Sequence, residues 1–211
     1  MSEKIKVRVT LNEELLGTTP NDEELFKTFV ASKAPEQEKK NEEIDSFGAE
    51  DAPLRGMTIF PKLEDGTPFI WDYQIKGFFK DACGMLSKLT GKDEVTGKKK
   101  KAVNESSKLT AYKKVIDGLI FVFPRKIPIN FDGEITSCQR PLRAQTPQGE
   151  RVALANSEAI PAGATIEFEI LCLSDEHLKV VKEWLDYGEL RGLGQWRNSG
   201  KGRFSYEILE S

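Results

Sequence analysis

Glycine and basic residues are concentrated in one short segment near the carboxyl end of the chain, Gly188–Phe204. Glycines let backbone amides turn toward an anion, and basic side chains supply positive charge, so the composition fits either a phosphate-binding loop or a purely structural one. The segment follows a predicted helix, and no Gly-Lys-Ser/Thr sequence opens a helix there. This order excludes a P-loop and a dinucleotide-binding fingerprint.

A second pair of cations lies in the middle of the chain. Apolar residues recur at helical spacing from about residue 75 to residue 89, which predicts a helix with Asp72 as its N-cap. Lys76 and Lys80, four residues apart, lie together on the opposite face of this helix. Gly77 costs about 1 kcal/mol there relative to alanine. Either a ligand approaches the backbone closely at this glycine or the helix simply tolerates it.

The net charge of −3 conceals an uneven distribution. Residues 76–143 hold 15 basic and 7 acidic side chains, whereas the segments on both sides of them are acidic. Such a basic middle favours a polyanion or an acidic protein as partner. The alternative is that Lys98–Lys101 forms a solvated loop. Two aromatic residues near the cationic segments, Tyr73 and Trp196, could stack on bases at about 1–3 kcal/mol each or could be ordinary packing residues.

Several classes of site are excluded by composition. The 211 residues include one histidine and three cysteines, and no two cysteines form a Cys-x-x-Cys pair. We therefore expect no disulfide framework, no zinc-finger site, no bound metal and no cofactor. No apolar run is long enough to span a membrane, and the amino end lacks an apolar signal segment, so we expect a cytoplasmic protein.

The periodicity predicts a single domain over residues 1–211. Strict alternation over Lys4–Leu11 predicts a half-buried strand with a basic outer face, and Ala164–Leu173 alternates in the same way. Further strands are predicted over 115–123, 127–135 and 203–209, a hairpin over 139–155, and a second helix after Ser174 that ends at Gly188. Residues 17–68 read as an acidic insertion. Two helices on one face of an antiparallel sheet give an α+β, ferredoxin-like fold.

Three segments follow one another along the chain. The first is Gly66–Phe79, which carries Gly-Thr-Pro-Phe-Ile before Ile-Lys-Gly; the second is Asn156–Phe168, which carries Ala-Ile-Pro-Ala-Gly; the third is Gly192–Phe204. In this order they resemble motifs of the CRISPR-associated RAMP superfamily, and of the backbone subunits of type III effector complexes in particular. Together the matched segments fall within residues 60–209. One departure is Trp71–Gln74, which stands where the family has Pro-Gly-Ser-Ser.

The resemblance implies an RRM-like, ferredoxin-type protein with a role in antiviral defence. Its partners would be single-stranded RNA or DNA, copies of itself in a head-to-tail assembly, and other effector-complex subunits, with residues 139–155 as a thumb-like hairpin. The resemblance and the charge pattern together imply the following nucleic-acid-binding residues: Lys76, Gly77, Lys80, Arg140, Arg143, Gly192, Gly194, Arg197, Gly200, Lys201, Gly202 and Arg203.

Three hypotheses about function follow. The leading one is sequence-independent binding of single-stranded nucleic acid, RNA before DNA, by an oligomerising subunit without enzymatic activity. The second is a metal-dependent endoribonuclease, for which Asp45 and Asp51 are weak candidates because neither has the Gly-Gly-x-Asp context of the RNA-cutting relatives. The third is a structural or interaction protein that has the same fold outside CRISPR complexes.

Overall fold

The computed structural model describes residues 2–21, 57–92, 99–101, 104–146 and 149–210. The elements discussed below are, in chain order, β1 (Glu3–Leu11), β2 (Leu15–Leu16), β3 (Thr19–Pro20), β4 (Met57–Ile59), β5 (Phe69–Trp71), α3 (Asp72–Leu86), β6 (Thr90–Lys92), β7 (Lys99–Lys101), α4 (Glu105–Lys108), α5 (Tyr112–Leu119), β8 (Ile120–Phe123), β9 (Lys126–Asn130), β10 (Thr136–Thr146), β11 (Gly149–Ile160), β12 (Thr165–Cys172), α6 (Asp175–Arg191) and β13 (Phe204–Glu210).

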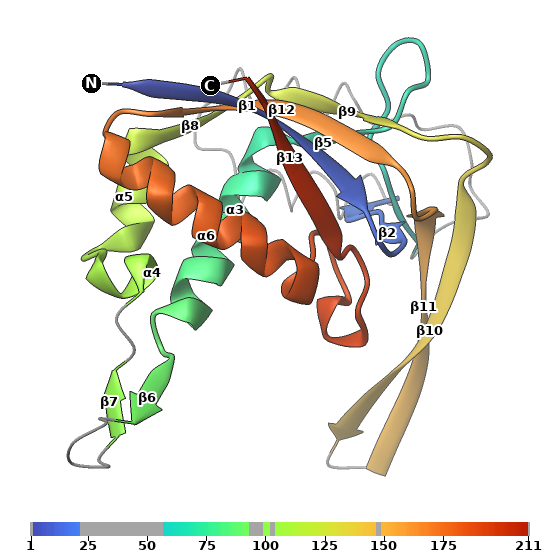
Figure 1. The fold of residues 1–211 in the computed structure, drawn as a ribbon. Coiled ribbons are helices and arrows are strands. Elements are labelled where there is room, and N and C mark those ends of the chain that lie inside the picture. Colours follow the sequence, from blue (N-terminus) through green and yellow to red (C-terminus); the bar gives the residue numbers. More distant parts are fainter. Residues whose placement is uncertain (1, 22–56, 93–98, 102–103, 147–148, 211) are drawn as a thin grey trace.

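Six of these elements form a β-α-β-β-α-β unit: β1, α3, β8, β12, α6 and β13 follow one another along the chain. The four strands lie in the spatial order β13-β1-β12-β8, and every neighbouring pair is antiparallel. Helices α3 and α6 cover one face of this sheet (Figure 1). This arrangement confirms the predicted α+β, ferredoxin-like fold.

The other elements are additions to that unit. Strand β9 extends the main sheet by pairing with β12 and β5. A second sheet has the order β10-β11-β4-β3, with β2 also on β11, and its β11–β4 contact is parallel. The long β10–β11 pair, which contains the predicted hairpin, and the small β6–β7 pair both extend away from the main sheet in the same direction (Figure 1).

The alternating pattern of β1 explains its central place. Ile5, Val7, Val9 and Leu11 are all buried, whereas the residues between them are partly or fully exposed. Strand β12 shows the same alternation and pairs with β1 over eight positions, from Glu3 opposite Cys172 to Thr10 opposite Thr165. The core therefore lies between this sheet and the two helices, where the buried aromatic residues Phe78, Phe79, Phe168, Trp184 and Phe204 also pack.

Helix α3 begins where the sequence predicts, but its N-cap is Trp71 and not Asp72. The Gln74 side chain accepts a hydrogen bond of 2.8 Å from the Trp71 amide and so satisfies one free backbone donor at the helix start. The buried stripe includes Ile75, Phe78, Phe79 and Ala82, as predicted. The helix ends at Leu86, so the apolar residue at position 89 lies beyond it and is exposed.

Helix α5 and the end of helix α6 differ from the sequence prediction, each for a physical reason, and the strand predicted over 127–135 ends at Asn130. Most of the strand predicted over 115–123 is helix α5, because Ile116 is buried in the core where α5 packs against α3; only Ile120–Phe123 is a strand. Helix α6 does not end at Gly188 but continues to Arg191. Gly188 is a packing requirement, since an added Cβ would lie closer than 3.0 Å to the Phe204 ring.

No helix in the described part of the chain combines the length and the apolar character that crossing a membrane requires.

Candidate nucleic-acid interface

Lys76, Gly77 and Lys80 lie outside the buried stripe of helix α3. Gly77 is exposed, and a Cβ added to it would meet no heavy atom of the described residues within 4 Å. No packing contact within the described part of the chain therefore requires glycine here, although glycine weakens the helix. Both lysines are partly buried.

The two lysines share one acidic residue on the neighbouring helix α5. Lys80 Nζ lies 2.6 Å from Asp117 Oδ1, and Lys76 Nζ donates at 3.3 Å to the Asp117 carbonyl oxygen. Lys76 Nζ also lies 5.0 Å from the centroid of the Phe121 ring. Burial lowers the pKa of Lys76, and Asp117 opposes this effect. Lys80 therefore pairs with the Asp117 carboxylate, whereas Lys76 meets a backbone carbonyl oxygen and feels the charges of Asp117 and Asp72 only from a distance.

The glycine-rich segment between α6 and β13, residues 192–203, is called the glycine loop below. Gly192, Gly194, Gly200 and Gly202 all have positive φ, between 70° and 88°, a conformation that side chains disfavour. At Gly192 and Gly202 an added Cβ would also lie closer than 3.0 Å to backbone atoms of the opposite side of the loop. These two glycines are needed for the loop to close on itself.

The hydrogen bonds of the glycine loop bear on the two interpretations of this segment, phosphate-binding or structural. Several amides that an anion site would need donate instead to protein carbonyl groups. Across the loop, the Leu193 amide donates at 2.8 Å to the Gly202 carbonyl oxygen. The Gly202 amide donates at 2.8 Å to the Glu14 carbonyl oxygen. The Gly192 and Gly200 amides each donate at 3.0 Å within the same region. These amides are therefore occupied by the fold itself.

Basic side chains at the end of α6 and in the glycine loop reach helix α3 and the connection between β1 and β2. Arg191 Nε and Arg197 NH1 each lie 2.9 Å from Asp81 Oδ2, one residue after Lys80. Lys201 pairs with Glu14, and this partner raises the pKa of Lys201. Asp81, like Asp117, is shared by two cations. The loop and α3, far apart in the sequence, thus lie against each other with more cations than carboxylates at their contact.

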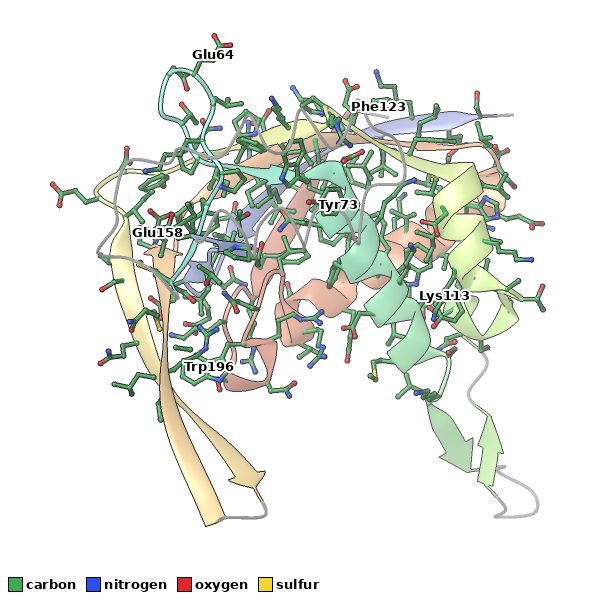
Figure 2. All side chains as sticks on the ribbon, turned by 180° about the vertical axis from the view of Figure 1, so that it is seen from behind. Glu64, Tyr73, Lys113, Phe123, Glu158 and Trp196 are labelled. Atoms are coloured by element: carbon green, nitrogen blue, oxygen red, sulfur yellow. The ribbon has the colours of Figure 1, made fainter. Side chains whose placement is uncertain are left out.

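The hairpin contributes Arg140 to the same region. Its guanidinium donates to Ser157 Oγ at 3.0 Å and to Gln195 Oε1 at 2.7 Å, and it lies over the Trp196 ring. Gln195 was missed by sequence reasoning, because a single glutamine in a glycine-rich segment carries no recognisable signal. Figure 2 shows Trp196 at the side of the loop that faces the hairpin.

The remaining candidates are placed as follows. Arg203 is exposed, and a Cβ on Gly200 would lie 3.6 Å from its guanidinium. Arg143 lies on β10 opposite Val152. The two aspartates considered for cleavage, Asp45 and Asp51, lie outside the described residues. Among the described residues, no group of three or more histidine, cysteine, aspartate or glutamate side chains could hold a metal ion.

The outer face of the main sheet is not the basic surface that the sequence predicts. Arg8 lies 2.8 Å from both Glu167 and Glu207, and Lys6 lies 3.3 Å from Glu167. A further pair joins Lys4 to Glu169 at 2.7 Å. Alternation alone could not reveal these pairs, because the acidic partners lie on β12 and β13, about 160 residues or more along the chain. Cross-strand pairing neutralises this face.

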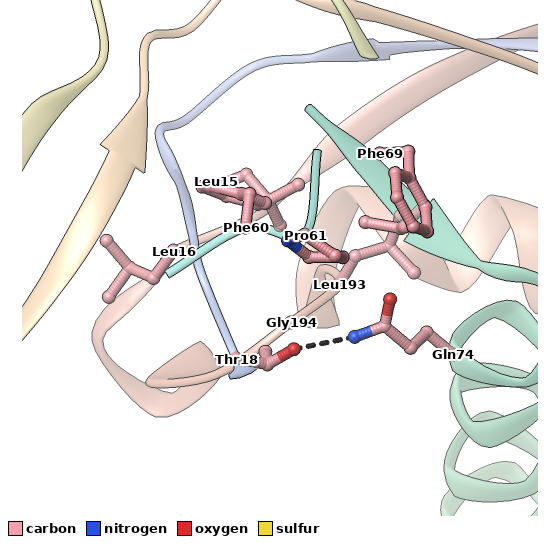
Figure 3. A pocket seen from close by; sticks show the side chains of 10 residues that line it. Leu15, Leu16, Thr18, Phe60, Pro61, Phe69, Gln74, Leu193 and Gly194 are labelled. Atoms are coloured by element: carbon pink, nitrogen blue, oxygen red, sulfur yellow. Dashed lines mark hydrogen bonds between the residues drawn. The ribbon is translucent and has the colours of Figure 1, made fainter. Parts of the chain in front are cut away.

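A small cavity of about 20 Å³ lies between the start of α3 and the glycine loop (Figure 3). Its walls include Leu15, Phe60, Phe69 and Leu193, and at its polar end Gln74 donates to Thr18 Oγ1 at 2.6 Å. The volume has room for about one water molecule and excludes a nucleotide. The cavity is a joint between the two segments and not a ligand pocket.

No protein-family model and no curated protein matches the chain. Among solved structures, the chain is similar to one from a cryo-EM structure of the type III-B Cmr-beta bound to cognate target RNA, with a TM-score of 0.50 and 13% identity. The match covers 99% of this chain and 61% of that one, so the chain spans about three fifths of the other's length. At this identity the likeness is one of fold: the chain has a mixed α+β, ferredoxin-like fold that it shares with that neighbour.

Proposed function

We propose that the chain binds single-stranded RNA along its sugar–phosphate backbone, without reading the sequence, as one subunit of a RAMP-type ribonucleoprotein assembly. The observation that carries the proposal is Gly77. It stands in a well-packed helix, exposed, with no described atom near its missing Cβ and with Lys76 and Lys80 together on the neighbouring face of the helix. A glycine kept there at a cost to helix stability allows a phosphate to approach the helix backbone closely.

The surrounding charges support the same ligand. Asp81 pairs with two guanidinium groups, and Lys76 contacts the backbone carbonyl oxygen of Asp117 while Lys80 takes its carboxylate, so the described ion pairs around α3 hold more cations than carboxylates. Arg203 adds an exposed basic residue. A polyanion satisfies such groups without any contact to a base edge, which is the property of backbone binding that ignores sequence.

The β10–β11 hairpin supports the proposed assembly. The β10–β11 hairpin extends beyond the compact part of the molecule, where it is available to a neighbouring copy. Copies of the chain, and other effector-complex subunits, are the partners that we propose for it. The structural neighbour was itself determined with target RNA bound.

The experiment is a salt titration of binding to unstructured single-stranded RNA. We expect the logarithm of the affinity to fall linearly with the logarithm of salt concentration, with a slope of about −0.7 for each phosphate neutralised. The double substitution Lys76→Ala and Lys80→Ala is expected to make the slope shallower by about one to two such steps. Binding that is absent, or that does not respond to salt, contradicts the proposal.

The matched control removes the same charge elsewhere. Lys179 and Lys182 are both exposed on α6, so Lys179→Ala with Lys182→Ala changes the net charge equally. If this control lowers the affinity as much as the α3 variant does, attraction is a property of net charge and not of the proposed interface. Single-stranded DNA of the same sequence serves as a second ligand, and tighter binding to DNA contradicts the assignment to RNA.

A further inference from the structure

Arg140 is an unusual residue to find inside a protein. It is only 6% exposed, and its partners are the neutral groups of Ser157, Gln195 and Trp196. Among the described residues no carboxylate pairs with it, although buried guanidinium groups ordinarily have one. Its positive charge is therefore held in place by hydrogen bonds and is not neutralised.

Trp196 is unusual in its backbone. It has a φ of 56° and lies in the left-handed region, which costs a residue with a side chain about 1–2 kcal/mol. The centre of the Arg140 guanidinium lies 5.2 Å from the centroid of its ring, and the residue remains partly exposed. Backbone strain of this kind persists only where the surrounding structure imposes it, and it is concentrated at functional sites.

Gln195 imposes it. Its side-chain amide nitrogen, which carries two hydrogens, has three acceptors within reach: Thr58 Oγ1 at 2.7 Å, Ser157 Oγ at 3.1 Å and the Gly17 carbonyl oxygen. Its carbonyl oxygen accepts from Arg140. One side chain thus joins the glycine loop to four other segments of the chain. The neighbouring indole is oriented before any ligand arrives, so binding need not spend free energy on ordering it.

We propose that Trp196 stacks on an unpaired base of the bound strand, with Arg140 as the positioning residue behind the ring. The inference rests on the proposed function and adds a base contact to a backbone contact. A ring held from one side by a guanidinium offers its exposed surface to a base, and stacking tolerates every base because each has a π-face. Duplex RNA, whose bases are stacked on one another, cannot make this contact.

The first test compares Trp196→Gly with wild type on two ligands: oligoadenylate and the same ribose–phosphate backbone without bases. Glycine removes the ring and also relieves the left-handed strain, so the loop is expected to stay folded. Affinity for oligoadenylate should fall about ten- to a hundredfold. Affinity for the abasic strand, and the salt slope on both ligands, should not change, because no phosphate contact is lost. Trp196→Phe should restore most of the loss.

Fluorescence provides an independent readout of the same contact. Of the three tryptophans, Trp71 and Trp184 are 2% and 0% exposed, so quenching by added oligoadenylate reports on Trp196. We expect quenching in wild type and none in Trp196→Phe. In Arg140→Met, which removes the charge behind the ring, we expect altered Trp196 emission and weaker binding to oligoadenylate but not to the abasic strand.

The outcomes separate this inference from the proposed function. If wild type binds oligoadenylate and the abasic strand equally and Trp196→Gly binds both as wild type does, the stacking contact is refuted while backbone binding stands. If wild type binds neither ligand, the proposed function fails and the stacking contact fails with it.

Discussion

Gly77 and Gly202 both follow a lysine, yet their surroundings differ in every respect. Gly202 has a positive φ and no space for a Cβ, since one would lie closer than 3.0 Å to Leu193 backbone atoms. Gly77 is helical and exposed, with open space in front of it. The described structure explains why residue 202 is glycine, and it gives no packing reason for glycine at position 77. Close approach by a ligand supplies the reason.

Gly77→Ala should therefore separate stability from binding. Alanine in an exposed helix interior is favoured over glycine, so the free energy of unfolding should rise by about 0.5–1 kcal/mol in chemical denaturation. RNA affinity should fall, because the added methyl group occupies the space that a phosphate needs. The matched control is Gly118→Ala on α5, where a Cβ also meets no atom within 4 Å. An equal loss of affinity in both variants, or in neither, argues against the role given to Gly77.

At the scale of the element, the glycine loop is a self-closing structure and only secondarily a surface. Its positive-φ residues and cross-loop hydrogen bonds fix its path, and Arg197 and Lys201 tie it to Asp81 and Glu14. This geometry determines which basic side chains of the loop remain available to a ligand. The loop positions basic side chains, and the amides that bond within the fold do not surround an anion.

A graded pair of substitutions tests this description of the loop. Gly202→Ala combines an unfavourable φ with a backbone clash, whereas Gly200→Ala has the unfavourable φ but only ordinary contact, at 3.6 Å, with the Arg203 side chain. We expect Gly200→Ala to lower the free energy of unfolding by about 1–2 kcal/mol and Gly202→Ala to lower it by more. Equal losses in denaturant titrations would mean that the loop is held less tightly than described.

The outer face of the main sheet predicts an acid-sensitive contribution to stability. Hydrogen bonds from Arg8 and then Lys6 lower the pKa of Glu167 below its ordinary value of 4.5, although burial opposes the shift. Since the folded-state pKa is lowered, the unfolded chain binds the proton more readily. The stabilisation is therefore complete above about pH 4.5 and is lost as the pH falls through the folded-state pKa.

Glu167→Gln should flatten the dependence of unfolding free energy on pH below about pH 4.5, with little change in its slope at higher pH. The measurement is denaturant unfolding at a series of acidic pH values. Glu134→Gln, at an exposed position, controls for the loss of one carboxylate. An unchanged pH profile in Glu167→Gln would show that the pairs with Arg8 and Lys6 do not form in solution.

At the scale of the whole molecule, the fold brings together residues that lie more than a hundred positions apart, such as Asp81 and Arg197. The sequence predicts the ferredoxin-like unit because strict alternation in β1 and β12 and the helical stripe of α3 are direct consequences of burial on one side. The sequence also identifies α3 and the glycine loop as cationic segments, because lysine and arginine residues can be located without knowing the fold.

What the sequence does not reveal are the partners of those residues. The neutralised sheet face depends on the register between β1, β12 and β13, and the occupied amides depend on how the glycine loop closes. The sequence predicts a strand where helix α5 lies, because the β-branched Val115 and Ile116 favour strands in isolation. In the fold, packing of α5 on α3 decides their structure. Gln195 became visible only through four contacts from separate segments.

The most direct measurement is ultraviolet crosslinking of the protein to single-stranded RNA, followed by mass-spectrometric identification of the crosslinked peptides. Backbone binding at the contact of α3 and the glycine loop predicts crosslinks in the peptides that contain residues 76–80 and 195–203. Crosslinks confined to the outer face of the main sheet, on β1 and β12, would contradict the account, as would a protein that yields no crosslinks under conditions in which it is folded.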